Sequence, residues 1–154
     1  MLAADLLKEE LQDYFGTAST VQNGKGLFRF TVANGNSTEQ LPCPPDRPEA
    51  YALSITPEQV VAVGRDDRGI FHAVQTIVQL LRKGADGVTE LPCVEIVDWP
   101  EKELRGTMLI PAPTKRLPWL KRAIRRFAAR HKFNFLLLGE ASSGNVRWSS
   151  HPEI

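Results

Sequence analysis

The side chains that could carry acid–base or metal chemistry are few and widely spaced. Asp66 and Asp67 are adjacent carboxylates, but they directly precede an amphipathic segment, where acidic side chains cap free N–H groups and suit the helix dipole. The histidines, His72, His131 and His151, fit no zinc-ligand spacing, and no HExxH or GxSxG motif accompanies them. We therefore predict that Asp66 or Asp67 caps a helix, and we expect no metal and no cofactor.

Two charged residues next to apolar runs are the candidates for binding a ligand. Arg105 lies within a predicted strand of otherwise apolar residues, so its guanidinium must be paired or must face a cavity. An ion pair with Glu103 or Asp98 and a ligand contact are equal alternatives. Glu140 follows a second apolar strand, at the end where parallel α/β folds place function. A single acid is not a mechanism, so a surface loop residue is the favoured interpretation of Glu140.

Charge is distributed unevenly along the chain. Residues 1–103 carry 9 Lys and Arg against 16 Asp and Glu, whereas residues 104–139 carry 9 basic residues and no acid. A predicted helix over 118–131 holds Lys121, Arg122, Arg125, Arg126 and Arg130 on its polar face. Such a cluster could bind an anionic polymer or nucleic acid. Because no aromatic stacking platform accompanies it, the favoured interpretation is a solvated outer helix face, and nucleic acid is not the expected partner.

Composition describes an ordinary globular protein. The 154 residues are 42% hydrophobic and 24% charged, which excludes collagen, coiled coils, low-complexity disorder and disulfide-dense miniproteins. No run of 18 apolar residues could span a membrane, and the first residues lack the features of a signal peptide, so the sequence assigns no compartment. Cys43 and Cys93 form no CxxC pair; buried thiols, the commoner case, and one disulfide both stay open.

Hydrophobic periodicity predicts an α+β domain over residues 1–100. Its sheet is mixed or antiparallel, with helices on one face. The second predicted helix begins after Asp66 and is closed by Gly84. The expected elements are a helix over 3–15, a strand over 27–33, a hairpin over 51–55 and 59–63, a helix over 67–83 and a strand over 92–98.

The segment after residue 101 has a different pattern. Strands over 104–110 and 133–138 flank the helix over 118–131, which predicts one right-handed βαβ unit. The second strand alternates poorly, as expected for a parallel strand covered on both faces. We interpret residues 101–154 as the opening of a TIM-like barrel. The helix residues expected to face inward are Leu120, Ala123, Ile124, Phe127, Ala128 and His131.

Several segments in this order resemble the non-catalytic domain and first barrel strand of family 20 glycoside hydrolases, the β-N-acetylhexosaminidases and chitobiases. The resemblance covers about residues 50–154. The matching segments are Tyr51–Pro57 (YALSITP), Gly69–Leu81 (GIFHAVQTIVQLL), Leu91–Pro100 (LPCVEIVDWP), Leu104–Leu109 (LRGTML) and Lys132–Phe135, with Ala129, Arg147 and, less firmly, Pro152–Ile154.

The resemblance implies where the chemistry of the family lies. Family members place an adjacent Asp and Glu on a later barrel strand; the Glu protonates the leaving oxygen, and the Asp orients the substrate's own N-acetyl group. No adjacent Asp–Glu pair follows residue 110 in this chain. The resemblance gives Arg105 a contact with sugar hydroxyls. Family polar positions are occupied by Ile110 and Pro113, and by Gly139 and Ser142, so either the branch is divergent or its active site has decayed.

These observations favour a fragment of a glycoside hydrolase that is inactive alone. Its expected partners are the remainder of the barrel and, in the full-length protein, a carbohydrate substrate. We expect no membrane partner, and we expect self-association through strand edges that an unfinished barrel exposes. The alternative is a non-enzymatic module that binds an anionic polymer or nucleic acid through residues 118–131.

Overall fold

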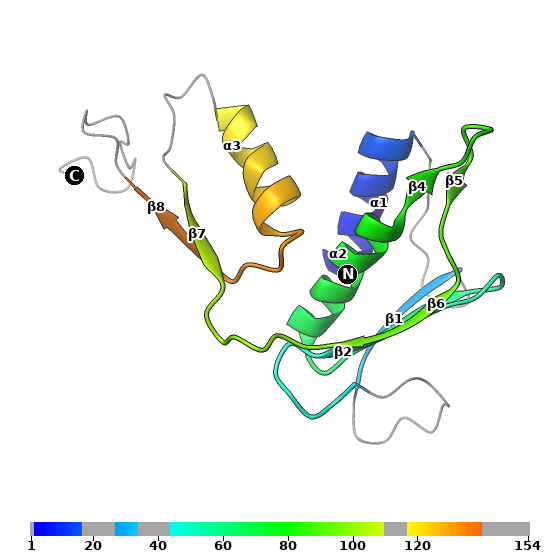
Figure 1. The fold of residues 1–154 in the computed structure, drawn as a ribbon, viewed down its shortest axis with the longest axis horizontal. Coiled ribbons are helices and arrows are strands. Elements are labelled where there is room, and N and C mark those ends of the chain that lie inside the picture. Colours follow the sequence, from blue (N-terminus) through cyan, green and yellow to red (C-terminus); the bar gives the residue numbers. More distant parts are fainter. Residues whose placement is uncertain (1, 17–26, 34–43, 110–116, 140–154) are drawn as a thin grey trace. The chain divides into compact units, whose positions relative to one another are not determined.

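The computed structural model describes residues 2–16, 27–33, 44–109 and 117–139 (Figure 1). Its contacts divide the chain into two compact units, residues 1–101 and 102–154. Within these ranges, the first unit contains a four-stranded sheet, a small hairpin and two helices. The described part of the second contains a pair of strands and one helical segment. No helix in the described ranges is both long and apolar enough to cross a membrane.

The first unit is built on a mixed sheet with the strand order β1-β3-β2-β6. β1 runs parallel to β3, whereas β2 is antiparallel to both β3 and β6. The predicted hairpin is confirmed, since β2 pairs with β3 from Tyr51 opposite Gly64 to Ile55 opposite Val60. The strands are β1 (Phe28–Val32), β2 (Tyr51–Ile55), β3 (Val60–Gly64) and β6 (Val94–Asp98).

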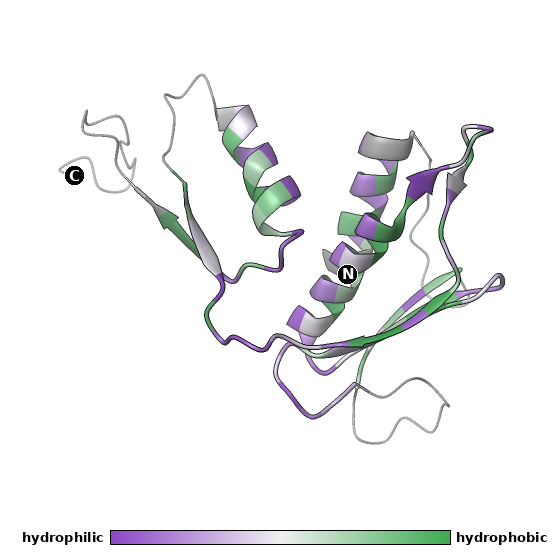
Figure 2. Ribbon diagram, in the orientation of Figure 1, coloured by the Kyte–Doolittle hydropathy of each residue, from purple (hydrophilic) through white to green (hydrophobic). Residues whose placement is uncertain are grey.

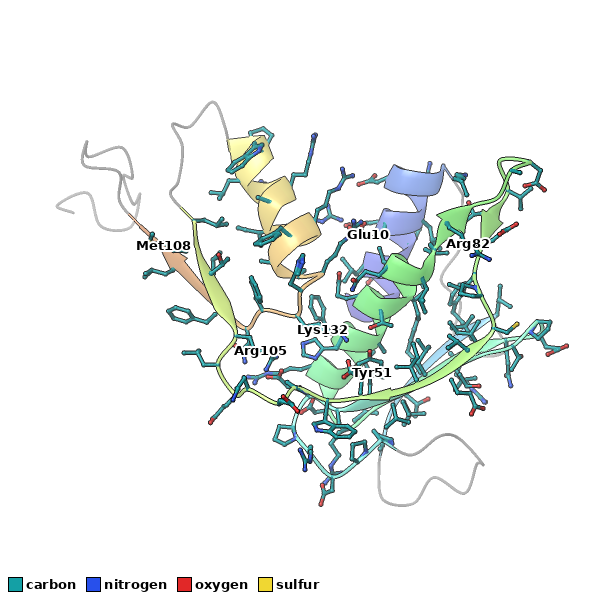
Figure 3. All side chains as sticks on the ribbon, viewed as in Figure 1. Glu10, Tyr51, Arg82, Arg105, Met108 and Lys132 are labelled. Atoms are coloured by element: carbon teal, nitrogen blue, oxygen red, sulfur yellow. The ribbon has the colours of Figure 1, made fainter. Side chains whose placement is uncertain are left out.

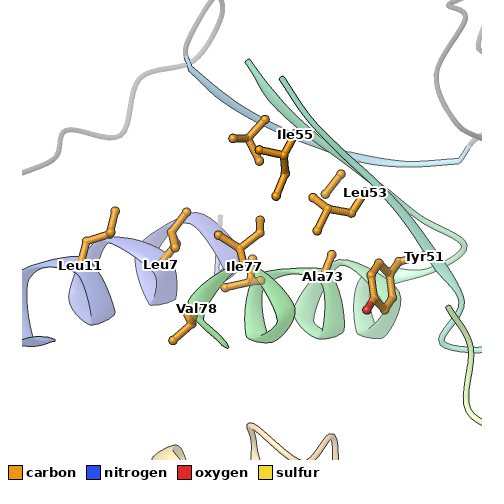
Figure 4. Packing of buried hydrophobic residues seen from close by; sticks show 11 residues of the cluster. Leu7, Leu11, Tyr51, Leu53, Ile55, Ala73, Ile77 and Val78 are labelled. Carbon is orange, nitrogen blue, oxygen red and sulfur yellow. The ribbon is translucent and has the colours of Figure 1, made fainter. Parts of the chain in front are cut away.

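Both helices of this unit, α1 (Leu2–Phe15) and α2 (Asp67–Leu80), lie on one face of the sheet, as expected (Figure 1). Their apolar residues recur at helical spacing and therefore form one stripe on each helix (Figure 2). That stripe packs on alternate residues of the strands (Figure 4). The fully or nearly buried members of this cluster include Leu7, Leu11, Tyr51, Leu53, Ala62, Val74 and Ile77.

The end of α2 differs from the prediction. The helix stops at Leu80, and Leu81 is already extended, with φ −63° and ψ 133°. The next residues form a two-stranded hairpin, β4 (Arg82–Lys83) with β5 (Thr89–Glu90). Gly84 therefore lies in the hairpin turn, where its N–H donates to the Val88 carbonyl, and it does not close the helix. Pairing with β5 overrides the helical spacing in the last turn.

The second unit contains a parallel strand pair joined by a helical crossover. β7 (Gly106–Leu109) pairs with β8 (Phe135–Leu138), from Gly106 opposite Phe135 to Leu109 opposite Leu138. The described part of the crossover contains α3 (Leu117–Ala123) and a π-helical segment, η2 (Ile124–Ala128). β7 starts at Gly106, so the expectation that Arg105 lies inside a strand is wrong by one residue.

The helical segment departs from the predicted inward face. Ala128 is buried and Leu120 is half-buried, but Phe127 is 45% exposed and His131 is exposed, so these two were wrongly placed inside. The physical reason is the π-helical turn, in which the N–H of Ala129 donates to the carbonyl of Ile124, five residues earlier. This wider turn breaks the 3.6-residue spacing on which the prediction rested.

One face of the strand pair carries exposed apolar side chains. Met108, Phe135 and Leu137 are 57%, 46% and 50% exposed, and Met108 points away from α3 (Figure 3). β8 was expected to be covered on both faces, but in the described part of the chain only one face is covered.

A buried and an exposed leucine allow the contribution of the core to stability to be tested. Leu53→Ala should lower the free energy of unfolding by about 2–5 kcal/mol, because Leu53 is fully buried between the sheet and α2. Leu104→Ala should change it by less than about 0.5 kcal/mol, because Leu104 is 70% exposed. Urea unfolding followed by circular dichroism measures both, and equal losses in the two variants would contradict this core assignment.

Candidate functional site

Arg105 lies just before β7 and is held on several sides by hydrogen bonds. Its Nε donates to the Lys132 carbonyl at 2.9 Å, and its Nη1 donates to the Lys102 carbonyl at 2.7 Å (Figure 3). A longer bond of 3.5 Å joins Nη1 to the Glu103 carbonyl. The guanidinium thus donates to backbone oxygens, an arrangement that the sequence alternatives of an ion pair or a ligand contact did not include. The sugar contact implied for Arg105 stays a prediction.

Asn134 also takes part in the hydrogen bonding around Arg105. Its Oδ1 accepts from the Arg105 N–H at 3.0 Å, and its Nδ2 donates to the Glu103 carbonyl at 2.7 Å. In return the Arg105 carbonyl accepts from the N–H groups of Asn134 and Phe135. Lys132 has the left-handed φ of 56°, which turns the chain from the helical segment towards β8. In the sequence, Lys132 and Asn134 belong to a matching segment of the family resemblance, and no pattern predicts their role.

Asp66 caps α2, as predicted for one of the two adjacent carboxylates. Its Oδ1 accepts from the Gly69 N–H at 2.8 Å, and its Oδ2 accepts from the Glu49 N–H at 3.0 Å. Partial burial by itself would raise the pKa of Asp66, but the N–H groups of Glu49, Gly69 and Arg68 and the charge of Arg68 outweigh it. The pKa therefore lies below its usual value. Asp67 is exposed on the first turn.

Glu49 is a buried acid that sequence reasoning missed. It is 5% exposed, has the left-handed φ of 64°, and accepts from Arg68 Nη1 at 3.3 Å. Its other oxygen lies 3.8 Å from Nε2 of His72, which is 4% exposed. Nothing in the local sequence marks this residue, because its contacts depend on the start of α2. The cluster ties residues 46–50 to that helix end.

Two glycines permit the close approach between this loop and α2. A side chain on Gly69 would overlap the Ala50 carbonyl oxygen, and one on Gly64 would overlap the Ile70 backbone nitrogen. The Ala50 carbonyl accepts from the Arg65 N–H at 2.8 Å. Glycine at these two positions therefore brings loop, strand and helix within hydrogen-bonding distance of one another.

The chain leaves the first unit through a fixed segment. The Tyr51 hydroxyl donates to the Asp98 carboxylate at 3.1 Å and lies 2.6 Å from the Thr76 hydroxyl. The Arg47 guanidinium lies over the Trp99 ring, 5.1 Å from its centroid. These contacts hold the end of β6 against α2 and against residues 46–50.

Several of the remaining sequence candidates lie outside the described residues, so their relation to Arg105 stays a prediction. These residues are Glu140, Ile110, Pro113, Ser142, His151 and Cys43. Cys93 is exposed and carries a free thiol, contrary to a buried position. In the described ranges no group of three or more His, Cys, Asp and Glu could hold a metal ion. On the basic segment Lys121 and Arg122 are exposed, whereas Arg125, Arg126 and Arg130 are half-buried.

Comparison with known families gives a match over residues 1–99, to the family described as glycosyl hydrolase family 20, domain 2. Solved structures extend the likeness. An inactive mutant of the family 20 exo-β-N-acetylglucosaminidase from Vibrio harveyi is 25% identical, with a TM-score of 0.73, over 98% of this chain and 22% of its own. The same enzyme in complex with N-acetylglucosamine is 27% identical, with a TM-score of 0.71, over 87% of this chain and 19% of its own.

A β-hexosaminidase from Streptomyces plicatus is also similar. A mutant of it in complex with the product GlcNAc is 27% identical, with a TM-score of 0.65, over 87% of this chain and 26% of its own. The chain thus spans about a fifth to a quarter of the length of these enzymes.

The cap at Asp66 makes the first unit sensitive to acid. Because the folded-state pKa lies below the ordinary value of 3.8, the carboxylate stabilises the fold above that value, and this stability is lost as the pH falls through the folded-state pKa. Asp66→Ala should cost about 1 kcal/mol at neutral pH and should flatten the acid limb of the stability curve.

Asp67→Ala is the matched control, since Asp67 is the neighbouring exposed carboxylate. Urea unfolding at a series of pH values measures both variants. An acid limb that Asp66→Ala leaves unchanged would rule out the cap as its source.

Proposed function

Since residues 1–99 carry its domain 2, the chain belongs to glycosyl hydrolase family 20, and we propose that it is part of a β-N-acetylhexosaminidase-like enzyme acting on a carbohydrate substrate. The observation that carries this proposal is the family match, extended by the N-acetylglucosaminidase and hexosaminidase structures that resemble the chain. In this proposal residues 1–100 form the non-catalytic domain and residues 101–154 form the opening of the catalytic barrel.

The role proposed for the first unit is to brace the barrel. A mixed sheet covered by two helices on one face supplies a rigid body. The contacts of Asp98 with Tyr51 and of Trp99 with Arg47 fix the last residues before the chain enters the second unit.

The parallel pair β7–β8 and its helical crossover support the barrel opening. A strand, a crossover helix and a parallel strand are the repeating unit of (β/α)8 barrels. The exposed apolar side chains of Met108, Phe135 and Leu137 lie on one face of the pair and suit a parallel sheet whose second face is covered in the complete barrel. The likeness to the Vibrio harveyi enzyme also extends beyond residue 99, because it covers 98% of the chain.

The catalytic step is proposed to depend on residues that this sequence does not contain. The resemblance assigns the step to an adjacent Asp and Glu, and no such pair follows residue 110. Substrate-assisted hydrolysis needs both groups, because one acid must protonate the leaving oxygen while the other orients the N-acetyl group. Residues 1–154 are therefore proposed to be inactive alone.

Activity assays test this proposal directly. The 154-residue chain should release no measurable chromophore from a nitrophenyl β-N-acetylglucosaminide. A longer chain that continues with an adjacent Asp–Glu after an apolar strand should hydrolyse it, and replacing that Glu by Gln should remove the activity. Turnover by residues 1–154 that Glu140→Gln abolishes would contradict the proposal, since it would place the acid inside this chain.

The oligomeric state of the 154-residue chain tests the proposal that β7 and β8 belong to an incomplete barrel. The uncovered face of β7–β8 should cause the 154-residue chain to form oligomers in sedimentation velocity, increasingly so at higher concentration. Met108→Lys should shift the distribution towards monomer. Val88→Lys should not, although Val88 is exposed to the same 57% on the β4–β5 hairpin. A wild-type chain that stays monomeric throughout a concentration series would show that this face needs no partner.

A further inference from the structure

We propose that Arg105 is a positioning residue that, together with Asn134, closes the amino-terminal end of the β7–β8 pair and sets its parallel register. This inference goes beyond the proposed function, since it gives Arg105 a role in the strand pair itself. It replaces the contact with sugar hydroxyls that the family resemblance implies for this residue.

The first support for this inference is the set of hydrogen bonds around Arg105. Backbone and side chain of Arg105 both bind the segment that leads into β8: the N–H donates to Asn134 Oδ1, the carbonyl accepts from the N–H groups of Asn134 and Phe135, and Nε donates to the Lys132 carbonyl. These bonds immediately precede the first residue pair of the ladder, Gly106 opposite Phe135. A slip of one residue would break all of them together.

The chemistry of the guanidinium explains why arginine suits this position. Its donors form a rigid planar fork, so one side chain can bind carbonyls from two separate segments at once. Here Nε binds Lys132, while Nη1 binds Lys102 and, at 3.5 Å, Glu103. Lys132 has a left-handed φ, so its carbonyl belongs to a turn and not to a helix or strand ladder. Arg105 stabilises that turn.

Asn134 contributes the second half of this arrangement. Its amide accepts from the Arg105 N–H and donates to the Glu103 carbonyl, so it uses both of its functional groups across a sequence separation of about 30 residues. A carboxylate could accept but could not donate, and an alanine could do neither. Arg105 and Asn134 therefore act as one hydrogen-bonded unit, which we call the Arg105–Asn134 clamp.

The direction of the strands places the clamp away from a barrel active site. Barrel enzymes use the carboxyl ends of their strands, and β7 ends at Leu109. Four residues of strand separate Arg105 from that end, a rise of roughly 13 Å at about 3.3 Å per residue. The guanidinium donates to carbonyls of residues that precede the two strands. It is therefore committed to the opposite end of the pair.

Backbone hydrogen exchange in the 154-residue chain tests the clamp. Arg105→Ala and Asn134→Ala should each raise the exchange rates of the amides of β7 and β8 roughly tenfold, with little effect on β2 and β3. The double variant should add little to either single variant, because the two residues form one unit. Arg105→Lys should not restore protection, since an ammonium group lacks the planar fork.

Lys132→Gly serves as the matched control. Glycine keeps the carbonyl that Arg105 binds and suits the left-handed φ, so protection of the strand amides should be retained. Unchanged exchange in both Arg105→Ala and Asn134→Ala would overturn the inference.

A measurement on the wild-type chain keeps the inference testable if the variants do not fold. The Nε–H of Arg105 should exchange slowly with solvent in nitrogen-15 spectra, and adding N-acetylglucosamine should not shift its signal. A rapidly exchanging signal, or one that moves on titration with the sugar, would return Arg105 to ligand binding. Hydrolysis by the longer chain can succeed or fail independently of this result, so the two proposals are tested separately.

Discussion

The first unit depends on the close approach of the start of α2 to the backbone at Ala50. Gly64 and Gly69 leave the space for it, and the Asp66 carboxylate bonds the N–H groups of both Gly69 and Glu49. The buried carboxylate of Glu49 then lies between Arg68 and His72. Through this contact the loop before β2, the end of β3 and the helix that covers the sheet are fixed together. The core under α1 and α2 forms on that arrangement.

Features with a local cause could be predicted from the sequence. The amphipathic spacing of α2, the turn between β2 and β3 and the Asp66 cap each depend on a short stretch of neighbouring residues. The parallel order of β7 and β8 followed from the intervening helical segment. The early end of α2 could not be predicted, because a two-residue pairing with β5 decides it. The π-helical turn likewise breaks a spacing that looked regular.

The contacts that matter most for the site are long-range, which is why the sequence did not reveal them. Glu49 and Asp66 are 17 positions apart, and Arg105 and Asn134 are 29 apart. Glu49 and Lys132 both have a left-handed φ but are not glycines, so their residue types do not predict a turn at either position. Arg105 could be recognised as a charge that needs partners, but backbone carbonyls leave no pattern in the sequence. The proposed function therefore rests on the family match and not on these contacts.

The parallel pairing of β1 with β3 has a consequence for the order of folding. Phe28 pairs with Val60, 32 positions later, whereas β2 and β3 are joined by a four-residue connection. Closing the longer loop costs more chain entropy. The contacts between β1 and β3 can offset that cost only after β3 is in place. We expect the hairpin and α2 to form the nucleus and β1 to dock late. Substitutions in β1 should then speed unfolding and leave the refolding rate almost unchanged.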